Sequence, residues 1–223
     1  GLGSVTISGG LLDLSQGAVN NAANRNGFVV GRNTTAGGVA LGTVNISGGT
    51  VTNAGQFILG AGLGATGNVC QVGGDVQQGV GRSGVTCYPI TLGWGGGCGR
   101  YTLSGGVFTS AQPVYVGGVT ITDIGYTPTG SVFTDGSSGT LRIDGGSFSV
   151  NTNLYLGRYG TGTLILGSNG VCSAQNVVLS DNTRSVLRFE FGPSGVCTLN
   201  VTGGLSISPG AKLEIDETKC DGC

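Results

Sequence analysis

The chain has 223 residues and a net charge of −1; 48 residues are glycine and only 9% are charged. This balance excludes a basic surface for nucleic acid, and no run reaches the ~18 apolar residues that a membrane-spanning helix needs. Because valine, isoleucine and threonine recur at regular places, we expect a folded β-protein and not a disordered chain.

Predicted strands begin near Val5 and follow one pattern, in which two apolar residues alternate with polar ones just before a Gly-Gly pair. Period-two alternation is typical of a strand with one buried face. The apolar pairs, in chain order, are Val5/Ile7, Val44/Ile46, Tyr101/Leu103, Leu141/Ile143 and Leu199/Val201. The glycine pairs start at Gly9, Gly48, Gly73, Gly105, Gly145 and Gly203, with a degenerate copy near Gly170. One position departs from the pattern, because Gln71 beside Val69 places an amide on the buried face.

Each unit contains two further predicted strands. The second has one apolar residue two positions after the glycines, at Leu12, Val51, Val76, Phe108 and Phe148. The third reads apolar-x-apolar-Gly, at residues 28–31, 57–60, 90–93, 114–117 and 154–157. Glycine accepts a positive φ without a Cβ clash, so these glycines predict sharp corners between short strands.

Three strands and three corners recur about every 25 residues, which predicts one coil of a parallel β-helix, or β-solenoid. We expect a single all-β domain over residues 1–223. It has two nearly duplicated blocks, about 1–97 and 98–195, and a final coil with a cysteine-bearing tail at 196–223. Loops are expected at Gly17–Ala40 and Val119–Ser138, and no helix is expected. The structural alternative, an immunoglobulin-like sandwich, predicts no fixed repeat of one corner motif.

The recurring phrase, clearest in Gly42–Val51, Gly139–Phe148 and Gly99–Phe108, resembles the autotransporter-associated β-strand repeats of bacterial surface and secreted proteins. The resemblance covers nearly the whole chain and implies a right-handed β-helix outside the cell, used as a stalk, an adhesin or a surface layer. The chain departs from that family in having seven cysteines and no membrane-anchoring barrel attached.

The cysteines suggest disulfides in an oxidising, extracellular compartment, because their spacing does not fit a zinc site and histidine is absent. The candidates are Cys70, Cys87, Cys98, Cys172, Cys197, Cys220 and Cys223. Cys172 and Cys197 are one 25-residue coil apart, and Cys70 and Cys98 are nearly so. The connectivity stays open. An odd thiol is left over, which suggests an intermolecular bond.

No catalytic, cofactor or metal site is predicted, since the chain lacks histidine and its carboxylates do not recur at one coil spacing. Asp144 is expected to form an exposed pair with Arg142. Residues 93–97 mimic a phosphate-binding loop, but no helix follows them. Threonine pairs at 50/52 and 120/122 do not recur as an ice-binding surface would require. The aromatic residues Tyr88, Trp94, Tyr101 and Tyr115 are candidates for a sugar-binding platform, but the last two fall at or near core positions.

Three sequons are possible glycosylation sites: Asn33, in a predicted loop, and Asn45 and Asn200, in predicted strands. Asn33 is the most plausible acceptor, because outward-facing asparagines on strands are ordinary ladder residues.

The expected function follows from the ends of the stack, because no amphipathic cap precedes the repeat that begins at Val5. We expect a secreted structural subunit that stacks head to tail with copies of itself into an extracellular or cell-surface filament, stabilised by disulfides. The alternative is an adhesin or glycan-binding stalk from a longer surface protein, with surface glycans as partners. A polysaccharide lyase or hydrolase is the third hypothesis. The missing initiator methionine suggests a processed chain or a fragment.

Overall fold

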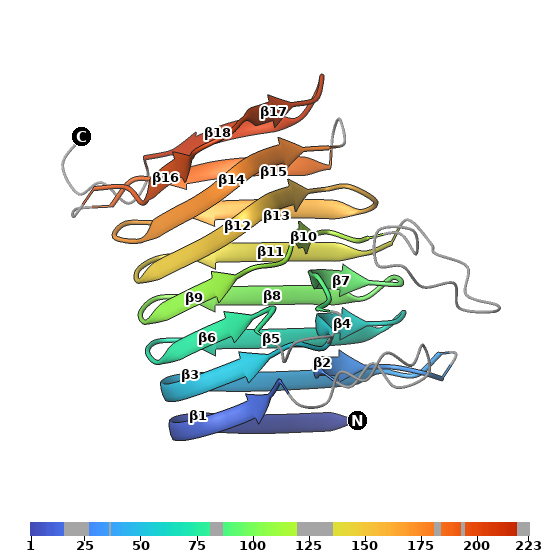
Figure 1. The fold of residues 1–223 in the computed structure, drawn as a ribbon. Helices are drawn as coiled ribbons and strands as arrows, with labels where there is room; N and C mark the ends of the chain where they lie inside the picture. Colours follow the sequence, from blue (N-terminus) through green and yellow to red (C-terminus); the bar gives the residue numbers. More distant parts are fainter. Residues whose placement is uncertain are drawn as a thin grey trace.

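The protein is an all-β stack of parallel strands (Figure 1). The computed structural model describes residues 1–15, 27–35, 37–80, 87–119, 136–180, 184–192 and 195–217. Over these ranges there is no helix, and every pairing between named strands is parallel. An immunoglobulin-like sandwich is built from antiparallel strands, so that alternative is wrong. The predicted parallel, solenoid-like sheet is confirmed.

The strands, in chain order, are β1 (Leu2–Leu14), β2 (Phe28–Arg32), β3 (Ala40–Asn53), β4 (Phe57–Ala61), β5 (Ala65–Gln71), β6 (Asp75–Gln78), β7 (Ile90–Trp94), β8 (Cys98–Leu103), β9 (Val107–Ser110), β10 (Val114–Val116), β11 (Ser138–Ile143), β12 (Ser147–Leu156), β13 (Thr161–Leu166), β14 (Val171–Leu179), β15 (Ser185–Glu190), β16 (Thr198–Val201), β17 (Leu205–Ile207) and β18 (Lys212–Asp216).

The pairing register arranges these strands on three faces. Face a holds the first half of β1, the first half of β3, and then β5, β8, β11, β13, β15 and β18. Face b holds the second halves of β1 and β3, then β6, β9, the first halves of β12 and β14, and β16. Face c holds β2, β4, β7, β10, the second halves of β12 and β14, and β17. The chain runs through a, b and c in turn and climbs one strand per coil.

Apolar side chains from the three faces meet inside the stack in columns. On face a, Val44 lies between Val5 of the coil below and Val69 of the coil above. The alternation read from the sequence is confirmed, because the predicted inward residues of all three segments, apart from the exposed Val5 of the first coil, belong to one core cluster or pack against it. Aromatic rings continue the columns; Phe108 stacks on Phe148 with 4.5 Å between ring centroids. Each coil therefore buries its apolar face only against its neighbours.

The number of residues per coil varies along the stack. The inward residues of one column on face a are Val5, Val44, Val69, Tyr101, Leu141, Leu164, Leu187 and Leu213. Adjacent members are thus between 23 and 40 residues apart, and Val44 and Val69 are 25 apart. The longer steps coincide with ranges at 16–26 and 120–135, which lie outside the described residues.

Two sequence assignments change in the structure. The segment before Gly203 is not a face a strand, because β16 pairs with the first half of β14 on face b. The range Gly17–Ala40 is not one loop, since it contains β2, which pairs with β4 on face c. The predicted loop Val119–Ser138 falls mostly outside the described residues.

Glycine at the corner between faces c and a is required by close backbone contact. Gly60, the next-to-last residue of β4, has a φ of +70°, a conformation that costs an L-residue more than it costs glycine. Gly99 in β8 packs against the next such corner, where a Cβ would collide with the amide nitrogen of Gly93 and the carbonyl oxygen of Leu59. The recurring glycines of the sequence therefore let successive corners nest at the spacing of paired strands.

Gln71 faces the core without a shift in register, and its amide is fully satisfied. The side chain is completely buried. Its nitrogen donates to the carbonyl oxygens of Gly74 and Val107, and its oxygen accepts a hydrogen bond from the hydroxyl of Tyr101. The residue that departs from the pattern is thus hydrogen-bonded to the tyrosine that lies opposite Val69 in the next coil.

Candidate functional site

The last coil leaves core-facing side chains uncovered. Among the described strands, β16, β17 and β18 each pair on one side only. Leu213 and Ile215 of β18 are 57% and 64% exposed, and Leu205 and Ile207 of β17 are 50% and 47% exposed. By contrast, Leu187, directly below Leu213 in the same column, is buried. This end of the stack, at the top of Figure 1, is an open cross-section of the core with free strand edges.

The opposite end has a groove of about 730 Å³ beside the first coil. Its walls are the beginning of β1, the strand β2 with the corner that follows it, and the beginning of β3. Val5, which is 52% exposed, lines the groove together with Val30 and the exposed Arg32. Within the described part of the chain, β1 pairs only with β3 and β2 only with β4. An open backbone edge beside apolar side chains has the chemistry of a strand-binding site.

No protein-family model matches this chain, and neither does any curated protein or solved structure. The described residues contain no group of three histidine, cysteine, aspartate or glutamate side chains placed to hold a metal ion. They also contain no helix long and apolar enough to cross a membrane.

The pair expected between Arg142 and Asp144 is present, but it belongs to a larger and less exposed cluster. Nε of Arg142 lies 2.6 Å from the Asp144 carboxylate, while its two terminal nitrogens bind both oxygens of Glu190 at 3.2 and 2.7 Å. Glu190 is only 5% exposed. Gly167 lies between Asp144 and Glu190 in the stack and leaves room for this contact, since a Cβ there would collide with the Asp144 carboxylate. Both carboxylates are thus held in ion pairs with one guanidinium.

The outward cysteines do not lie opposite one another. Cys70 on β5 is exposed, and its register partners are Asn45 and Thr102. Cys98, at the start of β8, is instead paired with Thr66 and Ser138. A pairing of Cys70 with Cys98, which their near one-coil spacing left open, therefore lacks the geometry of adjacent positions.

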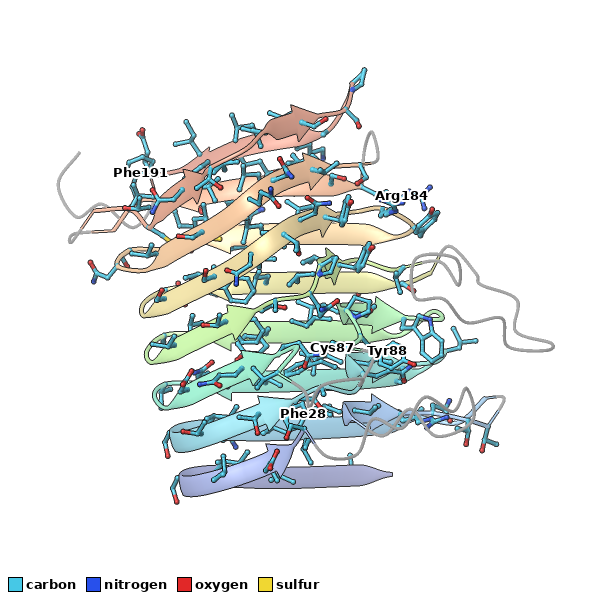
Figure 2. The ribbon with its side chains drawn as sticks, viewed as in Figure 1. Phe28, Cys87, Tyr88, Arg184 and Phe191 are labelled. Atoms are coloured by element: carbon cyan, nitrogen blue, oxygen red, sulfur yellow. The ribbon has the colours of Figure 1, made fainter. Side chains whose placement is uncertain are left out.

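Cys87 lies beside Tyr88 before the chain enters β7 (Figure 2), and its thiol donates to the carbonyl oxygen of Gly79 at 3.3 Å. Burial raises the pKa of the Cys87 thiol above its ordinary value.

The inward cysteines are in neighbouring coils but two residues out of register. Cys172 lies opposite Leu199, so Cys197 precedes the paired position by two residues. Cys197 lies in the corner just before β16, where its amide nitrogen donates to the carbonyl oxygen of Gly167, so it does not face Cys172 across paired strands. Both side chains are buried, and burial raises the pKa of the Cys197 thiol to about 11. The structure contains no disulfide at Cys70, Cys98, Cys172 or Cys197; Cys220 and Cys223 lie outside the described residues.

The three sequons differ in how their asparagines are used. Asn33 forms a turn in which its side-chain nitrogen donates to the carbonyl oxygens of Gly38 and Leu63, at 2.8 and 2.6 Å. The nitrogen that would carry a glycan is therefore engaged in holding the corner. Asn45 on β3 and Asn200 on β16 are exposed on outward positions. Glycosylation at all three positions stays a prediction.

The candidate sugar-binding aromatic residues do not form an open platform. Tyr101 is buried in the core. Tyr115 is buried outside it, stacked on Tyr155 with 4.9 Å between centroids, and the guanidinium of Arg158 lies 4.7 Å from the centroid of the Tyr155 ring. The cavity beside Trp94 and Tyr88 holds about 10 Å³. That volume accommodates about one water molecule and no sugar ring.

Proposed function

We propose that this chain is a structural subunit that associates end to end with copies of itself, forming an extracellular filament whose core is a right-handed parallel β-helix of about 25 residues per basic coil. The observation that carries the proposal is the uncovered last coil, where four core-facing aliphatic side chains are about half exposed. Exposed apolar cross-sections of this kind mark association surfaces, and free parallel edges pair with further strands. The proposal assigns the chain no cofactor and no catalytic role.

A second copy is the occupant that fits both ends. The side chains exposed at the last coil and those lining the groove of the first coil belong to the same inward columns of one core. The strands at both ends also run in the same direction, so joining the last coil of one copy to the first coil of the next continues a parallel ladder. Such a contact is heterologous and does not close, and it therefore produces a fibre. If the joint is also covalent, Cys220 or Cys223 would form the intermolecular disulfide.

The test is to image the 223-residue chain by electron microscopy and to measure its sedimentation, with and without reductant. We expect unbranched fibres that sediment as polymers. Loss of fibres in reductant would assign a disulfide to the joint, and their persistence would assign the joint to packing alone.

A matched pair of variants separates the end surface from general surface hydrophobicity. Ile215→Lys places a charge on the open coil and should abolish polymers while circular dichroism stays that of the wild type. Val107→Lys changes an aliphatic residue that is 43% exposed on the side of the stack, and should leave polymers intact. Isolated short rods of the wild-type chain at all concentrations, with the β-fold retained, would overturn the filament proposal.

A further inference from the structure

The two ends of the stack differ by a step, because the described strands do not make a whole number of coils. Four of the eighteen strands, β1, β3, β12 and β14, each cover two faces, which gives 22 strand segments. Face a has eight segments, and faces b and c have seven each, so β18 stands one level above β16 and β17. At the other end, the groove beside Val5 lies under β2, where a further face c strand would precede β1.

We propose that β18 of one copy occupies this groove in the next copy and pairs with β2, so that each subunit is rotated by about one third of a turn about the axis relative to its neighbour. The inference rests on the proposed filament and specifies its joint. In this arrangement the first half of β1 of the added copy pairs with β16 and its second half pairs with β17. All three faces then continue into the added copy without a missing strand.

Packing favours the rotated joint over a direct one. If β18 lay under β1 without rotation, faces b and c would each lack one strand level. Leu199 and Leu205 would then face a gap of about one strand spacing, ~4.8 Å, and would gain no cover from the added copy. In the rotated joint Leu213 and Ile215 stack on Phe28 and Val30, which extends the inward columns of face c.

Charge favours the same register. When Leu213 lies opposite Phe28, Glu217 falls opposite Arg32. Both side chains are exposed in the single chain. With β18 under β1 instead, Leu213 would lie opposite Val5, and Glu217 would fall opposite Gly9, which offers no charge. The rotated joint therefore places opposite charges together at the rim of an apolar contact.

Cysteine crosslinking distinguishes the two joints. In the rotated joint Glu214 lies opposite Val29, both pointing outward, whereas in the direct joint Glu214 lies opposite Thr6. Copies carrying Glu214→Cys are mixed with copies carrying Val29→Cys or Thr6→Cys, all in a Cys70→Ser background, and oxidised; the joined peptides are identified by mass spectrometry. We expect on the order of tenfold more 214–29 than 214–6 product, because directly opposed residues meet disulfide geometry.

The outcomes separate the joint from the filament itself. Fibres that crosslink through position 6, or through neither position, would overturn the rotated joint and leave the filament proposal standing. A chain that forms no fibres under any condition overturns the filament. Each single variant oxidised alone measures the background from the native thiols.

A charge exchange gives a second readout without new thiols. Arg32→Glu should raise the protein concentration at which polymers form about two- to tenfold, as expected for one exposed ion pair turned repulsive. Glu217→Arg should do the same, and the double variant should restore the wild-type value. Equal critical concentrations for all four proteins would contradict the assigned register.

Discussion

At the scale of single residues, the stack tolerates buried polar groups where neighbouring coils supply partners. Gln71 and Tyr101 lie in adjacent coils and bind each other inside the core. Arg142 similarly satisfies Glu190 across an intervening coil that contributes a glycine. In a fold built of repeated positions, a polar residue in one coil is thus accommodated by a substitution in another.

Removing the Tyr101 hydroxyl leaves the buried oxygen of Gln71 without its donor. Tyr101→Phe should lower the free energy of unfolding by about 1–3 kcal/mol at pH 7, measured by urea denaturation. The double variant Tyr101→Phe/Gln71→Leu should recover part of this loss, because no unpaired amide oxygen remains in the core, although the carbonyl oxygens of Gly74 and Val107 lose the side-chain donor.

The same pair predicts a pH dependence. Burial raises the pKa of Tyr101 well above its usual value near 10. The neutral phenol is therefore favoured in the folded state, and its contribution is complete below pH 10 and declines as the pH rises beyond it. The stability difference between wild type and Tyr101→Phe should narrow above pH 10. A constant difference between pH 8 and pH 11 would contradict the assignment.

Arg142 should matter far more than an arginine in an exposed pair. Arg142→Ala leaves the buried Glu190 carboxylate without its bidentate partner and should cost about 2–4 kcal/mol. The control is Arg188→Ala, whose pair with Glu214 has side chains 37% and 34% exposed and should contribute about 0–1 kcal/mol. Urea midpoints at equal slope give both values. Equal losses would show that burial of Glu190 has no energetic consequence.

At the scale of strands and corners, the spacing of coils depends on glycine columns. Gly99→Ala places a methyl group against backbone atoms of the adjacent corner and should destabilise the fold by at least ~2 kcal/mol. Gly3→Ala is the matched control, because Gly3 occupies the same column in the first coil and has no atom within 4 Å of the added carbon. Its effect on the free energy of unfolding of the monomer, obtained from thermal denaturation, should be within ~0.5 kcal/mol. Similar losses for both variants would contradict the nesting of corners.

The strands were predictable from the sequence because alternation and corner glycines are local signals. The alternation around Val44 and Ile46 predicts that their side chains face inward, and Gly60 predicts a corner at its own position. Register between coils is not local, since it depends on how many residues each corner takes up. For that reason Cys197 falls two residues from the position opposite Cys172, although the 25-residue spacing suggested a direct pair.

The end surfaces were only partly predictable. The difference in level between the two ends was not predictable, because the corner at Gly203 joins a face b strand to a face c strand, whereas the sequence pattern placed it between faces a and b. The pairing of β16 with β14 shows that the described strands form seven complete coils and the first strand, β18, of an eighth.

At the scale of the whole molecule, each coil contacts only the coils above and below, so local stability should vary along the axis. Amide hydrogen exchange of the monomer should be slowest in β5, β8 and β11 and fastest in β1, β17 and β18. Polymerisation should slow exchange selectively at β1, β2 and β16–β18. Uniform protection along the monomer would show that the stack unfolds as one cooperative unit. If polymerisation left exchange at the end strands unchanged, the contact between copies would lie elsewhere on the molecule.

Because all named strands pair in parallel, the two ends of the molecule are not interchangeable. One end offers a groove and the other a protruding strand, so an assembly of such molecules has a direction. Growth at either tip regenerates the tip that was there before. A peptide or protein that mimics only the protruding strand would then stop elongation at one tip and leave the other active. Stopping growth altogether would require a second molecule that blocks the other tip, so two blocking molecules would be needed per polymer, whatever its length.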